Sequence, residues 1–295
     1  MELVLAVDLG GTKLAVGVVD TDGRLRRRDQ LPTPSTSDER VLFDALAGLV
    51  ARFSPFDQYV ACGVGCGGPM SSGGVLVSPL NIPAWRSFPL AEELARLTGL
   101  QTHVDNDAKA LALAEGWVGA AVGQTDFMAM VVSTGVGGGI VLDSRLLDGN
   151  TGNAGHVGHI VVEPEGTPLP DHVPGVLEAE ASGTAIQFRT GRAPATASTA
   201  EIDRVGRAVG RAVGSVSNLL DLRLTVVAGS VALGYGEPFF TAAQAEIDRI
   251  CRLDHSRGAR IAPAGCGDEG PLIGAAAVAL RGLGRVVGVV RPASD

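Results

Sequence analysis

The chain has 295 residues, of which 45% are hydrophobic and 19% charged, and its formal net charge is −8. This composition excludes a disordered chain, and the length provides for two domains of ordinary size. A nucleic-acid partner is disfavoured, because such affinity depends on Lys and Arg neutralising phosphates. We also expect no membrane helix, because no apolar run reaches about 18 residues.

The start of the chain and its cysteines indicate a cytoplasmic protein. The segment Met1–Leu5 has no basic region and runs directly into a strand pattern, so we expect no signal peptide. The cysteines form no C-x-x-C pair, and we expect buried thiols in a reducing compartment at Cys62, Cys66, Cys251 and Cys266.

The predicted elements begin with two strands joined at Gly10-Gly11, over residues 4–20. The basic run Arg24–Arg28 follows and is expected to be a solvated strand edge. Apolar spacing then predicts helices over 37–53, 90–97 and 107–118. A second strand–glycine–strand pattern covers 128–143, and residues 163–175 form a loop or lid. The remaining elements are a helix at 201–220, a strand at 224–228, a helix near 237–252, a strand at 259–262 and a helix at 270–282.

Alternating strands and helices are typical of α/β layers. The two copies of one glycine hairpin suggest a duplicated domain that faces its twin across a cleft. We expect a smaller N-terminal α/β domain made of residues 1–106 and 283–295. Residues 107–282 are expected to form the larger C-terminal α/β domain.

The two hairpins are candidates for phosphate binding. In D-L-G-G-T-K, residues 8–13, the glycines let backbone N–H groups turn toward an anion, and Asp8 at the strand end is placed to hold Mg²⁺ through water. The bland alternative is a structural hairpin. The twin S-T-G-V-G-G-G at residues 133–139 favours the phosphate interpretation, because two such hairpins can clamp the phosphates of ATP.

A third candidate is the sequence H-V-D-N-D-A at residues 103–108, where a strand meets a helix. An ionised Asp107 at a helix N-terminus can accept a hydroxyl proton, and Asn106 offers a donor and an acceptor to neighbouring hydroxyls. A plain N-cap is an equally good interpretation of these residues.

Taken together, the motifs resemble the ROK family of sugar kinases, in the actin–hexokinase (ribonuclease H-like) fold group. The matching segments appear in family order: D-L-G-G-T-K (8–13), P-L-N-I-P-A-W (79–85), D-N-D-A (105–108), S-T-G-V-G-G-G-I (133–140), G-N-A-G-H-V-G-H (152–159), L-E-A-E-A-S-G-T-A-I (177–186) and L-I-G-A-A (272–276). The resemblance covers nearly the whole chain and implies two α/β domains that close on a sugar and MgATP, in a homodimer.

The resemblance also implies residue roles. Asp107 would be the general base for the sugar 6-hydroxyl. The implied sugar ligands are Gly68, Asn81, Asn106, His156, His159 and Glu178. The implied nucleotide and phosphate residues are Asp8, which also lies near Mg²⁺, Gly10, Gly11, Thr12, Lys13, Thr134, Gly135, Gly229 and Gly274.

One stretch departs from the family. The family pattern A-G-E-x-G-H is followed by C-x-C-G-x-x-G-C-x-E, in which the histidine and three cysteines bind zinc. Here His156 replaces the glutamate, and Leu169, Asp171 and Val176 stand where the cysteines would. Structural zinc needs four good ligands, so we expect no zinc site, with a rescue by His159, Asp171 and His172 as the alternative. His159 is expected to keep a sugar or structural role. His156 is either a sugar ligand with changed specificity or a bystander.

The expected activity is ATP-dependent phosphorylation of the 6-hydroxyl of glucose or a glucose-like hexose. One alternative is an amino-sugar 6-kinase, for example for kanosamine, because an imidazole in place of a carboxylate changes which hydroxyl or amine pattern fits. Another is a catalytically weak sugar-sensing protein. A DNA-binding regulator is disfavoured, because only seven residues precede Asp8 and the net charge is negative.

Overall fold

A computed structural model describes residues 1–170 and 172–291 of the chain. They fold into two compact units, of which unit 1 comprises residues 1–123, 144–154 and 266 onward, and unit 2 comprises 124–143 and 155–265. This division differs from the expected one at residues 106–107 and 282–283. The helices at Asp107–Trp117 and Gly270–Gly282 belong to unit 1, because they pack against each other and the second also packs against the strands of unit 1.

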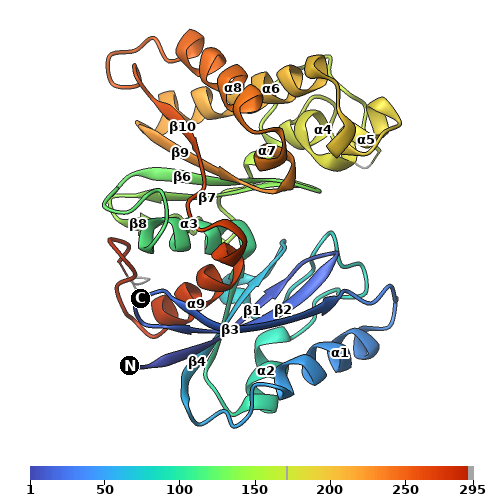
Figure 1. The fold of residues 1–295 in the computed structure, drawn as a ribbon, viewed down its shortest axis with the longest axis vertical. Coiled ribbons are helices and arrows are strands. Elements are labelled where there is room, and N and C mark those ends of the chain that lie inside the picture. The colour runs from blue at the N-terminus through green and yellow to red at the C-terminus, as the bar shows by residue number, and fades with distance from the viewer. Residues whose placement is uncertain (171, 292–295) are drawn as a thin grey trace. The chain divides into compact units, whose positions relative to one another are not determined.

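Unit 1 is built on a mixed sheet with the strand order β3-β2-β1-β4-β5. Strands β2 and β3 are antiparallel to their neighbours, whereas β4 is parallel to both β1 and β5. In Figure 1, α1 and α2 lie on one face of this sheet and α9 on the other. The elements are β1 (Leu3–Leu9), β2 (Lys13–Asp20), β3 (Leu25–Pro32), α1 (Glu39–Ala51), β4 (Tyr59–Cys66), a 3-10 turn (Ser72–Gly74), α2 (Leu90–Thr98), β5 (Thr102–Asn106), α3 (Asp107–Trp117), a 3-10 turn (Gly267–Glu269) and α9 (Gly270–Gly282).

Unit 2 is built on the strands β10, β9, β6 and β7 of the second sheet, which are neighbours in that order. Strand β7 is antiparallel to β6, and β9 is parallel to both β6 and β10. Its elements are β6 (Phe127–Val132), β7 (Val136–Leu142), a 3-10 turn (Val157–His159), α4 (Leu177–Ala181), α5 (Gly183–Thr190), a 3-10 turn (Pro194–Thr196), α6 (Thr199–Leu220), β9 (Leu224–Ala228), α7 (Ser230–Tyr235), α8 (Glu237–Ile250) and β10 (Arg260–Pro263). The short strand β8 (Arg145–Leu146) follows β7 in the chain and belongs to the second stretch of unit 1.

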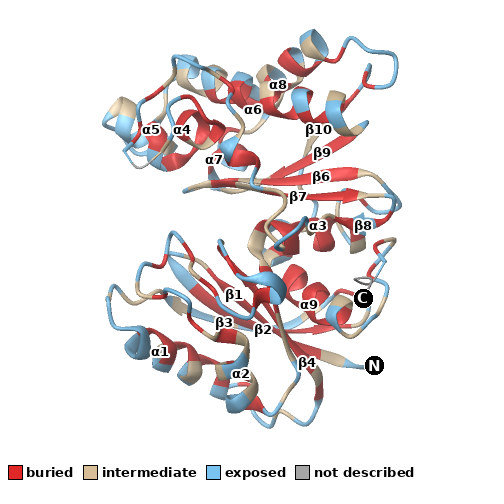
Figure 2. Cartoon of the chain, turned by 180° about the vertical axis from the view of Figure 1, so that it is seen from behind, coloured by how far each residue is buried: buried red, intermediate tan, exposed pale blue. Residues whose placement is uncertain are grey.

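The two sheets repeat one topology, which confirms the predicted α/β class and its duplication. In each sheet a glycine hairpin supplies the central strand and its antiparallel neighbour, and two parallel strands continue on the other side. The strands β1, β4 and β6 are buried along almost their whole length (Figure 2). Their sequences are almost uniformly apolar, as is typical of strands with parallel neighbours that are covered on both faces. The basic run at Arg26, Arg27 and Arg28 lies exposed on the edge strand β3, as predicted.

The cysteines are free thiols, and Cys62, Cys66 and Cys251 are buried while Cys266 is half-buried. Burial raises the pKa of the Cys62 thiol to about 12, so this group stays protonated near neutral pH. Within residues 1–170 and 172–291, no helix combines the length and apolarity needed to cross a membrane.

A glycine sets the distance between β4 and α9. A Cβ on Gly63 would lie 1.9 Å from the carbonyl oxygen of Ala275, so the helix backbone rests directly on the strand. Gly274 makes the equivalent contact with α3, where its Cβ would lie 2.5 Å from the carbonyl oxygen of Ala110. The helix α9 therefore packs closely, through glycines, against both β4 and α3.

We predict that Gly63→Ala lowers the melting temperature by several degrees. The added methyl group must push α9 away from β4, and such overpacking costs about 1–3 kcal/mol. The matched control is Gly48→Ala in α1, where no heavy atom lies within 4 Å of the new Cβ. Alanine is the better helix former by about 1 kcal/mol, so the control should be unchanged or more stable. Thermal unfolding by circular dichroism measures both, and equal stability of the two variants would contradict this packing argument.

Candidate active site

The carboxyl edge of the first sheet brings the acidic candidates of unit 1 together. Asp8 on β1 pairs with Gly65 on β4, and Gly65 pairs with Asp105 on β5. Asp107 follows β5 directly, at the start of α3. Because β1, β4 and β5 are parallel, their carboxyl ends lie at the same edge of the sheet. A Cβ on Gly65 would lie 3.8 Å from both an Asp8 carboxylate oxygen and the Cα of Asp107. The structure therefore makes Asp8 and Asp107 neighbours, although 98 residues lie between them in the sequence.

The electrostatics of this edge fit a divalent cation. The pKa of Asp8 is raised to about 7, chiefly by burial and then by the nearby Asp107 carboxylate, while Lys13 lowers it. A cation beside these carboxylates would stabilise their ionised forms, and carboxylate oxygens are ligands that Mg²⁺ prefers. The donor set therefore fits the Mg²⁺ ion expected from the sequence, with Asp8 as the residue to hold it.

Asn106 and Asp107 occupy the first turn of α3. The Oδ1 atom of Asn106 accepts hydrogen bonds from the backbone N–H groups of Ala108 and Lys109 at 3.0 and 3.4 Å. Asn106 is thus the N-cap of the helix, which agrees with the structural alternative for this residue. Its amide nitrogen is a donor and remains a candidate contact for a hydroxyl. The Oδ1 atom of Asp107 accepts from the N–H of Ala108 at 2.9 Å, which orients the carboxylate at the helix N-terminus.

Asn81 and Gly68 lie beside the same edge. A Cβ on Gly11 would lie 2.8 Å from the backbone oxygen of Asn81, and a Cβ on Gly67 would lie 2.9 Å from its side-chain oxygen. The carbonyl of Gly68 accepts a hydrogen bond from the N–H of Leu80 at 3.1 Å, which holds the two segments together. The sequence-predicted sugar residues of unit 1 therefore gather where the first hairpin turns.

The first hairpin presents its turn to solvent. The N–H of Gly10 donates to the carbonyl of Lys13 at 3.0 Å, and the hydroxyl of Thr33 donates to the carbonyl of Gly10 at 2.7 Å. Gly11, Thr12 and Lys13 are exposed. This arrangement leaves the turn accessible to an anion, as the phosphate interpretation requires.

A buried lysine, Lys109, lies in the first turn of α3. Lys109 has a side chain that is 2% exposed, and its ammonium group forms an ion pair with Asp105 at 2.9 Å. The same group donates to Asp148 Oδ1 at 2.7 Å and to the carbonyl of Gly152 at 3.1 Å. Arg281 from α9 donates to the other oxygen of Asp148 at 2.5 Å. These two cations and two anions form a charge cluster that sequence reasoning missed, because Asp148 and Arg281 lie far along the chain from the other two.

In unit 2, the second hairpin lies against Glu178. The backbone N–H of Val136 donates to Glu178 Oε2 at 2.6 Å, and a Cβ on Gly135 would lie 2.9 Å from that oxygen. The carbonyl of Thr134 accepts a hydrogen bond from the hydroxyl of Thr184 at 3.0 Å. The predicted phosphate residues Thr134 and Gly135 are therefore next to the predicted sugar ligand Glu178.

The two histidines lie on the 3-10 turn Val157–His159 and the residue before it. Their rings are exposed, with centroids 6.0 Å apart and tilted by 52°. The turn is pressed onto β7 and α4, because a Cβ on Gly158 would lie 2.4 Å from the carbonyl oxygen of Val136 and 3.4 Å from the Cβ of Glu178. His156 and His159 are thus carried by a segment that touches the hairpin and Glu178.

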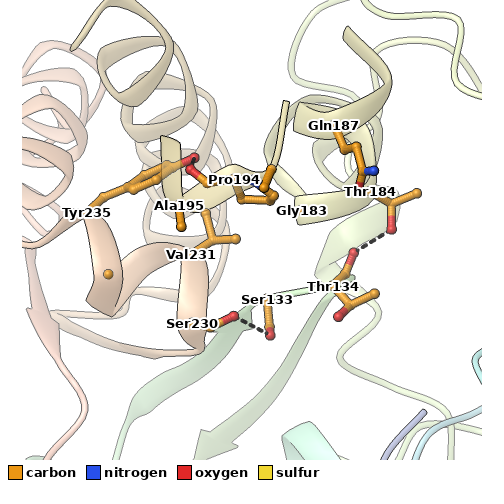
Figure 3. A pocket seen from close by; sticks show the side chains of 12 residues that line it. Ser133, Thr134, Gly183, Thr184, Gln187, Pro194, Ala195, Ser230, Val231 and Tyr235 are labelled. Atoms are coloured by element: carbon orange, nitrogen blue, oxygen red, sulfur yellow. Dashed lines mark hydrogen bonds between the residues drawn. The ribbon is translucent and has the colours of Figure 1, made fainter. Parts of the chain in front are cut away.

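Unit 2 also contains a cavity of about 600 Å³ beside the second hairpin. Figure 3 shows the Ser133 and Ser230 hydroxyls hydrogen-bonded at 3.0 Å at its floor, and Tyr235 and Pro194 at the opposite side. Gly229, just before Ser230, has a φ of 103°, and a Cβ there would lie 2.3 Å from the carbonyl oxygen of Val132. The predicted residues Thr134 and Gly229 therefore flank this cavity. Sequence reasoning missed its other lining residues, among them Gln187, Pro194 and Tyr235.

Gly274, which the family resemblance placed near the nucleotide, is not among the residues that line this cavity. It is buried in the middle of α9, and its contact with Ala110 explains why a glycine is needed there. Its predicted contact with a nucleotide stays a prediction.

The loop that would carry zinc in the family is held by apolar contacts. Leu169 and Val176 are buried and form a small cluster with Ala179 and Ala185. Across residues 1–170 and 172–291, no group of three or more His, Cys, Asp or Glu side chains is arranged to hold a metal ion. Asp171 lies outside the described residues. The positions of two of the missing cysteines are thus filled by core residues.

The ROK family profile matches residues 4–281. The N-acetylmannosamine kinase of Escherichia fergusonii is 37% identical over 248 residues, which cover 79% of this chain and 84% of that protein. The corresponding kinase of Citrobacter koseri is 38% identical over the same number of residues, with the same coverage.

Solved structures give the same result. A ROK hexokinase from Thermus thermophilus is 32% identical with a TM-score of 0.80, covering 95% of this chain and 99% of that one. A ROK family glucokinase from Streptomyces griseus, in complex with glucose and AMPPNP, is 28% identical with a TM-score of 0.81, covering 94% and 99%. The fold is therefore that of the ROK kinases, with two duplicated α/β units, and the chain belongs to the ROK family.

Proposed function

We propose that the protein is an ATP-dependent sugar kinase that phosphorylates the 6-hydroxyl of a hexose. The observation that carries this proposal is the meeting of Asp8 and Asp107 at the carboxyl edge of the first sheet, beside an exposed glycine hairpin. Membership of the ROK family supports it, as do the kinase names of the relatives.

In this mechanism Asp107 is the general base. Its carboxylate accepts the proton of the 6-hydroxyl as that oxygen forms a bond to the γ-phosphorus of ATP, while the bond from this phosphorus to the bridging oxygen breaks and ADP leaves. Asn106 fixes the helix turn that carries Asp107 and offers its amide N–H to a sugar hydroxyl. Mg²⁺ held by Asp8 would neutralise phosphate charge. Phosphoryl transfer depends mainly on positioning and charge stabilisation, which is what this arrangement of residues supplies.

The nucleotide is assigned to the two hairpins and the cavity of unit 2. The exposed turn Gly10–Lys13 and the residues Thr134 and Gly135 are proposed to bind phosphates. The cavity of about 600 Å³, with Gly229 at its edge, has the size of an ordinary ligand site and is proposed to take the adenosine. A relative crystallised with AMPPNP supports the choice of ATP.

We propose N-acetylmannosamine as the first substrate to test and glucose as the second. The named relatives at 37–38% identity support the acetamido sugar. His156 is compatible with it, because an imidazole in place of an acceptor-only carboxylate changes which polar groups of the sugar can be accepted. His156, His159, Glu178, Asn81 and Gly68 are the proposed sugar contacts.

We predict that Asp107→Asn lowers kcat at least about a hundredfold, because the amide cannot accept the hydroxyl proton. ADP release measured by a coupled assay gives kcat, and the melting temperature should stay close to that of the wild type. The control is Asp44→Asn on the exposed face of α1, which should leave kcat unchanged. Retained turnover in Asp107→Asn would remove Asp107 from its proposed role.

The substrate assignment is tested by ADP release with MgATP against N-acetylmannosamine, N-acetylglucosamine, mannose, glucose, glucosamine and 3-amino-3-deoxyglucose. We expect the highest kcat/KM with N-acetylmannosamine, and we expect His156→Glu to shift preference toward glucose by about tenfold or more. Highest kcat/KM with glucose would contradict the acetamido-sugar assignment, and no turnover with any sugar would favour a sugar sensor.

The expectation that the enzyme needs no zinc is tested in a parallel arm. Enzyme that has been treated with EDTA, and to which only Mg²⁺ is returned, should retain full activity.

A further inference from the structure

Glu178 is held by two donors at once. Its Oε2 atom accepts from the backbone N–H of Val136 at 2.6 Å, and its Oε1 atom lies 2.8 Å from Nε2 of His172. Val136 belongs to β7, whereas His172 belongs to the loop that precedes α4. The carboxylate is therefore fixed by two segments that approach it independently.

Each ring nitrogen of His172 lies within hydrogen-bond distance of an oxygen atom. Its Nδ1 atom lies 2.9 Å from the carbonyl oxygen of Pro170, while its Nε2 atom faces the Glu178 carboxylate. Both neighbours accept hydrogen bonds and neither donates one. The imidazolium form satisfies both contacts, and a charged donor beside a carboxylate forms one of the stronger hydrogen bonds in proteins.

The loop that carries His172 is anchored without this contact. Leu169 and Val176 are buried on either side of it. Before it in the chain, the N–H of Thr167 donates to the buried carboxylate of Glu180, which also accepts from Arg204 at 2.6 Å. The backbone N–H of His172 donates to the carbonyl of Leu169 at 3.1 Å. Thr167, Leu169 and Val176 on either side of His172 are therefore anchored independently of its contact with Glu178.

We propose that His172 is a positioning residue for sugar binding. It holds the Glu178 carboxylate in one orientation, so that each oxygen keeps a lone pair for a sugar hydroxyl or amide N–H. This inference rests on the proposed function, in which Glu178 is a sugar ligand. His172 would orient Glu178 through its Oε1 atom, while the backbone N–H of Val136 holds the Oε2 atom.

The test compares His172→Phe with His172→Gln. Phenylalanine removes the donor, so KM for the sugar should rise by about tenfold or more, while KM for ATP and the melting temperature stay close to wild type. Glutamine places an amide N–H near the former Nε2 position and should restore much of the loss. The matched control is His255→Phe, since His255 is exposed and its Nε2 atom, like that of His172, lies near an oxygen, here the carbonyl of Asn218 at 3.1 Å.

A double-mutant cycle with Glu178→Gln separates positioning from a general structural effect. In the Glu178→Gln background, His172→Phe should add little to KM for the sugar, because the oriented group is already changed. An unchanged sugar KM in His172→Phe would overturn the proposal. A loss shared equally by the sugar and ATP, accompanied by a lower melting temperature and no rescue by glutamine, would also overturn it.

A second readout does not depend on turnover. Nitrogen-15 NMR of the histidine rings, with the His172 signal identified by its loss in His172→Gln, should show a proton on Nε2 that shifts strongly in Glu178→Gln. An unprotonated Nε2 would overturn the positioning role even in an active kinase. If the proton is present while no sugar binds or reacts, the contact stands and the proposed function fails instead.

Discussion

One buried charge cluster joins the three separate stretches of chain that make up unit 1. Lys109 comes from the first stretch, Asp148 from the second and Arg281 from the third, with Asp105 completing the set. The Lys109, Asp105 and Arg281 side chains are at most 12% exposed, whereas Asp148 is 41% exposed. Charges so far out of water are tolerable only when each has partners of the right geometry, and losing one partner is strongly destabilising. The first turn of α3, with the proposed base Asp107, follows Asp105 directly, so its position depends on whether these distant segments have met.

The duplicated topology explains how one architecture serves two kinds of chemistry. Each sheet ends its central strand in a glycine turn, but the surroundings of the two turns differ. In unit 1 the turn lies beside two carboxylates in an environment that raises the pKa of Asp8. In unit 2 the turn lies beside a fixed carboxylate and a cavity lined by small side chains and one tyrosine. The same strand–turn–strand geometry thus lies beside two carboxylates in unit 1 and beside a cavity in unit 2.

Features that arise from local sequence were well predicted. The hairpins, α1, α3, α6 and the strand β9 follow from apolar periodicity and glycine pairs. The meeting of Asp8 with Asp107 was not predicted, because it depends on the order of the parallel strands in the sheet. The helices α4 and α5 were not predicted, because they are short and separated only by Ser182. The ion pair of Lys109 with Asp148 and the contact of His172 with Glu178 were also missed, since both depend on tertiary distances that no periodicity encodes.

The cluster of Leu169 and Val176 changes what controls the loop before α4. Contacts of aliphatic side chains weaken on cooling, because the hydrophobic driving force near room temperature is largely entropic and grows with temperature. A loop tied by thiolates and a metal responds to chelators and oxidants. Here buried aliphatic side chains take that place. The order of this loop, which precedes the proposed sugar ligand Glu178, should therefore depend on temperature more than on the metal supply or the redox state of the cell.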